Sequence, residues 1–119
     1  QLKKNKMKKF IVIYHTPTEA AKQMAGKSQE DMAKGMEAWM IWAKKCGDAL
    51  VDMGSPLMGG QVLSPNGTTA PSTKEVNGYS IVQAANMKAA VALFNGHPHL
   101  TWNDSCSIEL HEVMPLPGM

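Results

Sequence analysis

The sequence predicts one α+β domain whose elements follow the order strand, helix, strand, strand, helix, strand. Three observations predict it. The length of 119 residues is that of a single domain. Four segments carry the β-branched and aromatic residues of strands, and two others carry apolar residues at helical spacing. Right-handed crossovers between these elements give an antiparallel four-stranded sheet with both helices on one face.

The first strand is predicted at residues 9–16, before the helix-breaking Thr16-Pro17-Thr18. Its side chains alternate between two faces, one with Phe10, Val12 and Tyr14 and the other with Ile11, Ile13 and His15. Because both faces are mostly apolar, we expect this strand to be central and covered on both sides. Since both helices should lie on one face, self-association is the simplest cover for the other.

A short helical turn is predicted at residues 19–25, and a long helix follows it. Ser28 with Asp31 three residues later resembles a capping box at the start of that helix. Gly47, just behind two lysines, should end it. Apolar residues recur along the helix at helical spacing and should face the sheet. They are Met32, Met36, Trp39, Met40 and Ala43.

Glycines and a proline interrupt the apolar segment 49–63, which predicts a bent or bulged strand. The following residues, 64–73, are polar and rich in turn formers, and we expect a mobile loop. A third strand is predicted at 78–84.

The second helix should begin at the cap Asn86 and run to Phe94. Asn95-Gly96 should end it, and Pro98 should prevent its continuation. The last strand is predicted at 105–114.

The composition excludes several classes of function. All 12 basic residues are lysine, and without arginine, the usual clamp for phosphate and guanine, we expect no nucleic-acid partner. No stretch approaches the roughly 20 apolar residues of a membrane span. The apolar run 10–14 is too short for a signal peptide, so we expect a cytoplasmic protein with no membrane partner.

The basic residues also concentrate at the N-terminus, where the first nine residues hold five lysines. Met7 resembles a natural start, so we interpret residues 1–6 as an N-terminal extension and 7–119 as the single domain. Cys46 and Cys106 match no metal or redox spacing and should be buried free thiols.

Short motifs along the chain together resemble a known family. They are Met36-Glu37-Ala38-Trp39 with Trp42, Gly54-Ser55-Pro56-Leu57, Gly78-Tyr79-Ser80-Ile81-Val82-Gln83-Ala84, Gly96-His97-Pro98-His99-Leu100 and Ser107-Ile108-Glu109-Leu110. Their order and spacing resemble those of YCII-related proteins, in the branch that carries the DGPF motif. The resemblance implies a ferredoxin-like fold, a homodimer through the sheet that forms a dimeric α/β barrel, and a small-molecule pocket between the sheet and the long helix.

The YCII group proper is thought to use a histidine–aspartate pair, with the histidine in the long helix. Met36 stands near that position here, so the resemblance does not transfer this pair to the chain. The catalytic candidates must therefore come from other residues.

Four residues are catalytic candidates. Imidazoles titrate near neutrality, so His97 and His99, held in a turn by Pro98, could act as acid or base. Their alternative role is a helix cap that satisfies carbonyl groups. His15 is a further candidate or a hydrogen-bonded interface residue, and Asp104 could orient His97 or His99.

His111, on the same strand row as Glu109, should face a partner or solvent. Because no histidine pair has metal-ligand spacing on a regular element, we expect no metal. We also expect no cofactor.

Several apolar side chains could line a ligand pocket, or could be plain core. The ligand-binding candidates are Tyr14, Met36, Trp39, Met40 and Tyr79. We therefore expect a YCII-like homodimer that binds a small organic molecule. Two alternatives stay open: a cofactor-independent enzyme with hydrolase- or isomerase-like acid–base chemistry at His97, and a non-catalytic dimeric scaffold.

Overall fold

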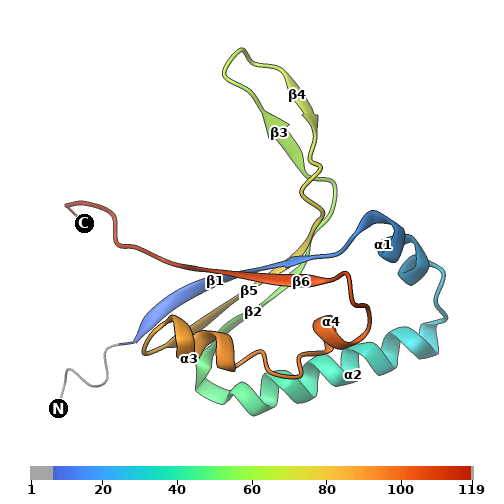
Figure 1. The fold of residues 1–119 in the computed structure, drawn as a ribbon, viewed down its shortest axis with the longest axis horizontal. Helices are drawn as coiled ribbons and strands as arrows, with labels where there is room; N and C mark the ends of the chain where they lie inside the picture. Colours follow the sequence, from blue (N-terminus) through green and yellow to red (C-terminus); the bar gives the residue numbers. More distant parts are fainter. Residues whose placement is uncertain (1–6, 119) are drawn as a thin grey trace.

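The computed structural model describes residues 7–118, so the extension predicted at 1–6 lies outside the described residues. Four strands form one antiparallel sheet in the order β2-β5-β1-β6 (Figure 1). Their bounds are Lys8–His15 for β1, Leu50–Pro56 for β2, Val76–Ala84 for β5 and Ser107–Glu112 for β6. The predicted α+β class and four-stranded antiparallel sheet are confirmed, and the sheet of this single chain is not closed into a barrel.

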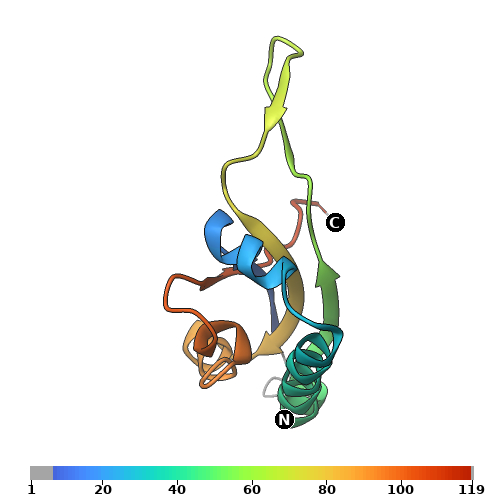
Figure 2. The ribbon, with the colours of Figure 1, turned by 90° about the vertical axis from the view of Figure 1, so that its right-hand side faces the viewer.

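The helices are α1 (Thr18–Ala25), α2 (Gln29–Cys46), α3 (Met87–Ala92) and α4 (Pro98–Thr101), with a 3₁₀ turn, η2 (Gly47–Ala49), after α2. Figure 1 shows α2, α3 and α4 on one side of the sheet, and Figure 2 shows the same arrangement from the side. Sequence reasoning missed α4, because Pro98 does not prevent a helix here. It occupies the first turn of a new one, where a missing N–H costs nothing.

The predicted N-caps of α2 and α3 and the predicted end of α2 are confirmed, whereas α3 ends at Ala92 and does not continue to Phe94 as predicted. The Ser28 hydroxyl accepts a hydrogen bond from the Asp31 N–H at 3.1 Å and so caps α2. In the same way, the Asn86 side chain accepts from the Ala89 N–H at 2.8 Å and caps α3. Gly47 ends α2 with a φ of 57°, a left-handed conformation that glycine adopts easily.

The core lies between β1, β5 and the helices. Strand β1 directs Phe10, Val12 and Tyr14 into it, where they meet Val82 from β5. The helices contribute Trp42, Ala90 and Phe94. Cys46 and Cys106 are both free thiols as predicted, but the predicted burial is wrong for Cys46, which is partly exposed at the last position of α2, whereas Cys106 is buried.

Helix α2 does not bury its methionines as the sequence predicted. Met32, Met36 and Met40 expose 56%, 55% and 52% of their surface, so their expected packing on the sheet is wrong. The reason is the rotation of the helix about its axis. The side that faces the core carries Trp42 and Trp39, whose indole rings bury more apolar area than methionine does.

Between β2 and β5 the chain leaves the sheet as a hairpin, residues 57–73, which we call the arm. Within it β3 (Gln61–Leu63) pairs antiparallel with β4 (Thr69–Pro71). Figure 1 shows the arm extending from the sheet away from α2. The loop predicted at 64–73 therefore contains a strand. The strand predicted at 49–63 is divided into β3 and β2, of which β2 is bulged as predicted.

The glycine of the bulged strand should be irreplaceable. Gly54 has a φ of 80°, and a Cβ built there would lie 1.7 Å from the carbonyl oxygen of Tyr79. We predict that Gly54→Ala lowers the free energy of unfolding by more than about 2 kcal/mol, because the backbones of β2 and β5 must separate. Urea unfolding measures this change.

Gly35→Ala is the matched control, because a Cβ on Gly35 in α2 would meet no atom within 4 Å. Alanine there should raise the free energy of unfolding by up to about 1 kcal/mol. Equal effects of the two substitutions would contradict the close approach of β2 and β5.

Candidate functional site

A buried imidazole lies between the sheet and α2. His97, the residue before α4, exposes none of its surface. Aromatic rings surround it at these centroid distances: Trp42 at 4.4 Å, Trp39 at 4.5 Å, Tyr14 at 5.5 Å and Phe94 at 5.5 Å. We call these four rings the aromatic cage of His97.

The hydrogen bonds of His97 fix its tautomer. Its Nδ1 accepts a hydrogen bond from the backbone N–H of His99 at 2.9 Å, so in the neutral ring the hydrogen is on Nε2. Nε2 is buried, and it has no hydrogen-bond partner among the described residues. Burial, and then the proximity of His99, lower the pKa of His97 to about 4. At neutral pH the cage therefore contains an unpaired N–H donor.

His99 has a structural role in this arrangement. Its Nε2–H lies 2.9 Å from the carbonyl oxygen of His15 and 3.1 Å from that of Ser107, so one ring clamps the paired ends of β1 and β6. Burial lowers the pKa of His99, which keeps this ring a neutral donor to the two carbonyls. From the sequence, His99 could act as an acid or base or donate to backbone carbonyls. Its contacts support the second role.

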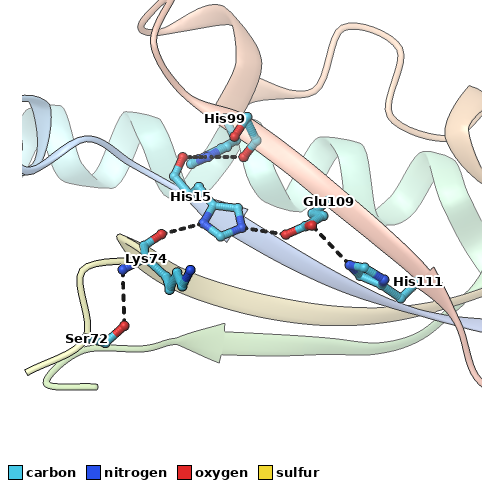
Figure 3. Close-up of polar contacts among 7 residues, drawn as sticks. His15, Ser72, Lys74, His99, Glu109 and His111 are labelled. Atoms are coloured by element: carbon cyan, nitrogen blue, oxygen red, sulfur yellow. Dashed lines mark hydrogen bonds and ion pairs between the residues drawn. The ribbon is translucent and has the colours of Figure 1, made fainter. Parts of the chain in front are cut away.

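A second polar cluster lies on the opposite face of the sheet, which no core residue covers. Figure 3 shows His15, Glu109 and His111 in a line along β1 and β6. The His15 Nε2 lies 2.9 Å from Glu109 Oε1, and the His111 Nε2 lies 3.2 Å from Glu109 Oε2. These two hydrogen bonds lower the pKa of Glu109, which stays largely exposed. The carboxylate thus joins the two imidazoles from either side.

Both ring nitrogens of His15 face groups that only accept hydrogen bonds. Nδ1 lies 2.8 Å from the backbone carbonyl oxygen of Lys74, and Nε2 faces the Glu109 carboxylate (Figure 3). A neutral imidazole has a single N–H and donates to one of these two acceptors, whereas a doubly protonated ring donates to both. Through these contacts His15 connects β1 to β6 and to the chain before β5.

The remaining candidates do not join one site. Asp104 is exposed and makes no hydrogen bond to His97 or His99 among those of the described residues. Of the ligand-binding candidates, Tyr14 and Trp39 belong to the aromatic cage. Met36 and Met40 are exposed on α2, and Tyr79 lies opposite Ile13 on the uncovered face.

Two shallow hollows lie beside the cage. The larger, about 320 Å³, is between α3, α4 and β6 and is lined mainly by apolar side chains. The smaller, about 260 Å³, is between α2 and α4. Phe94 lines the first and Trp42 the second, so one ring of the cage borders each.

Sequence reasoning missed two parts of these arrangements. It did not place Trp42 and Phe94 around His97, because only the tertiary fold brings three segments together there. It noted that Glu109 and His111 share a row, but not that His15 reaches the same carboxylate. The register Ile13↔Glu109 and His15↔Ser107 determines that contact, and alternation within one strand does not reveal register.

Comparisons with family models and with curated proteins found no match to this chain. Among residues 7–118, no group of three or more potential ligands could hold a metal ion. No helix in the same part of the chain is long and apolar enough to cross a membrane.

The depressed pKa of His97 should make stability depend on pH. Between its ordinary pKa of 6.5 and about 4, the unfolded chain binds a proton at this ring and the folded chain does not. The free energy of unfolding should therefore fall as pH falls through this window, by about 3 kcal/mol in total for His97. Urea unfolding from pH 7.5 to 4.5 measures it.

His97→Phe should remove most of this dependence of the free energy of unfolding on pH. The lowered pKa of His99 contributes a smaller dependence of the same sign, which should remain. Glu109, whose pKa is lowered from 4.5, should add its own loss only at still lower pH. An imidazole of His97 that titrates near pH 6.5 by NMR would contradict the burial of an unpaired neutral ring.

Proposed function

We propose that this protein is a homodimer that binds a small organic molecule between the sheet and α2, at the ring of His97. The observation that carries the proposal is the unpaired Nε2–H inside the aromatic cage. A buried donor without an acceptor costs about 1–3 kcal/mol. A ligand that brings an acceptor to Nε2 regains that free energy, and an apolar molecule of the same shape does not.

The cage favours a particular chemical class. Its walls are aromatic, so the body of the ligand should be flat and apolar. The polar group that the cage offers to a ligand is a donor, because His97 Nδ1 accepts the hydrogen bond of the His99 N–H and the ring hydrogen is on Nε2. The ligand should therefore present an acceptor oxygen, of which a carbonyl is the simplest, and no second polar group at the buried end.

Trp39 is the side chain that should move to admit the ligand. The indole N–H of Trp42 donates to the carbonyl oxygen of Leu93 at 2.8 Å, which anchors that wall. Trp39 is only half-buried, and no such anchor is present for it among the described residues. The part of α2 before it, residues 29–37, is exposed throughout.

An enzyme that uses His97 is the alternative at the same place. A neutral imidazole donor can polarise a bound carbonyl, as established for some isomerases. Acid–base chemistry at Nε2 would require the hydrogen to leave Nε2. The hydrogen would then either move to Nδ1, which breaks the hydrogen bond from the His99 N–H, or leave the ring with a negative charge. The geometry therefore favours binding, with carbonyl polarisation as the chemistry nearest to it.

The homodimer would cover the second face of the sheet. That face presents Ile11, Ile13, Tyr79 and Ile81, all partly exposed, beside the His15–Glu109–His111 line. A second copy offers the same apolar surface, and a twofold axis makes the two surfaces complementary. The strand order β2-β5-β1-β6 supports a ferredoxin-like fold, and two such sheets face to face would form the dimeric α/β barrel of YCII-related proteins.

Binding at His97 should discriminate between two ligands that differ in one acceptor. We predict that acetophenone binds about tenfold more tightly than ethylbenzene, because only its carbonyl can accept from Nε2–H. His97→Phe should abolish this preference, whereas His111→Phe, the control on the other face, should preserve it. Isothermal titration and Trp fluorescence measure both affinities.

Trp39→Ala should strengthen the binding of acetophenone and keep its preference over ethylbenzene, since it removes the movable wall. Equal affinities of the two ligands for the wild-type chain, or a preference that survives His97→Phe, would rule out His97 as the ligand's donor.

The dimer should dissociate when a charge enters the uncovered face. We predict that the wild-type chain sediments as a dimer and that Ile13→Lys sediments as a monomer, because the substitution replaces apolar contact surface with a charge that the interface would have to bury. Ile41→Lys, at an exposed position of α2, is the control and should remain dimeric. A wild-type chain that is monomeric at all concentrations would contradict the proposal.

A further inference from the structure

The arm carries no charged residue. Residues 57–73 contain no Lys, Arg, Asp, Glu or His, in a chain that is 18% charged. The two arm strands are exposed throughout, and Met58 and Leu63 expose 93% and 74% of their surface. Proteins normally protect free strand edges with charges, whereas the centres of interfaces are depleted of charges. The arm therefore has the composition of an interface and the exposure of a free surface.

The base of the arm is held firmly by the body of the protein. At this base the His15 Nδ1–H donates to the Lys74 carbonyl oxygen at 2.8 Å, and the Thr16 N–H donates to the Glu75 carbonyl oxygen at 3.0 Å. The Glu75 carboxylate accepts from the Thr18 N–H at 2.8 Å. Glu75 has a φ of 57°, a conformation that costs a non-glycine residue about 1–3 kcal/mol. These contacts maintain that conformation and so determine where the arm points.

The rest of the described chain, within residues 7–118, does not cover the arm. Figures 1 and 2 both show the arm reaching beyond the sheet, away from α2 and α3. The radius of gyration is 16.5 Å, whereas a compact domain of this length has about 13.5 Å. An isolated two-stranded hairpin is only marginally stable in water. The arm is therefore left uncovered by the described residues, and a second chain can supply the cover.

We propose that the arm packs on a second copy of this chain and clasps the homodimer. This inference rests on the proposed sheet-to-sheet homodimer. The arm is the direct continuation of β2 and β5, so its direction is fixed relative to the face that the second copy would cover. Because of the twofold axis, each arm would contact the same surface of the other subunit. The absence of charge favours this permanent contact over a transient partner, whose interface would be more polar.

A shortened arm tests the proposal. The Ser72 N–H donates to the Gly60 carbonyl at 2.9 Å, so positions 60 and 72 are already paired. Residues 61–71 can therefore be replaced by Asn-Gly, the sequence preferred in two-residue hairpin turns, while the contacts at the base remain. We expect the dimer dissociation constant, measured by sedimentation, to rise at least tenfold while the chain stays folded by circular dichroism.

Point substitutions in the full-length chain provide a second measurement. Met58→Lys with Leu63→Lys should weaken the dimer at least tenfold. Gln61→Lys with Thr73→Lys adds the same charge without removing apolar surface, and it should weaken the dimer much less. By hydrogen exchange, the arm amides should be protected in the wild-type dimer and exchange rapidly in the Ile13→Lys monomer.

The outcomes separate the two proposals. If the wild-type chain is a dimer and the shortened arm leaves its dissociation constant within twofold, the clasp is wrong and the sheet-to-sheet homodimer stands. If the wild-type chain is a monomer, the homodimer is wrong and the clasp with it. A tenfold weakening by both arm variants, with the control double substitution close to wild type, supports the clasp.

Discussion

Strand β1 is apolar on both faces and pairs on both edges, with β5 and with β6. Among residues 7–118 the helices cover one of its faces, and that face, with Phe10, Val12 and Tyr14, forms the core. The other face keeps Ile11 and Ile13 partly exposed. Burial of apolar surface is the main stabilising term in folding. The apolar side chains on the uncovered face of this strand remain in contact with water and do not contribute it. The proposed homodimer and its clasp both follow from this imbalance.

The proposed ligand site and the proposed dimer face are two sides of the same strand. Tyr14 contacts His97 on the helix side, and His15, the next residue, contacts Glu109 on the other. His99 connects the two by donating to the carbonyl of His15. A single peptide thus separates the proposed ligand site from the proposed subunit interface.

Local features of the sequence predicted local structure well. The caps Ser28 and Asn86 depend on residues three positions away, and the alternation within β1 depends on neighbours two positions away. Features that depend on tertiary contact could not be predicted. The rotation of α2 depends on which side chains compete for the core, and the burial of His97 depends on rings from three other segments. The candidate list held His97 for its chemistry but gave no indication of its cage.

The position of β1 in the chain also affects how the protein is made. This strand is synthesised before its two partners, β5 and β6, which begin only at residues 76 and 107. The pairing of β1 with β6 therefore cannot form until the chain has been made beyond residue 107. Pairings between segments so far apart form slowly, because loop closure must precede them. During synthesis the two apolar faces of β1 are both unprotected, and the growing chain is then most prone to associate with other chains.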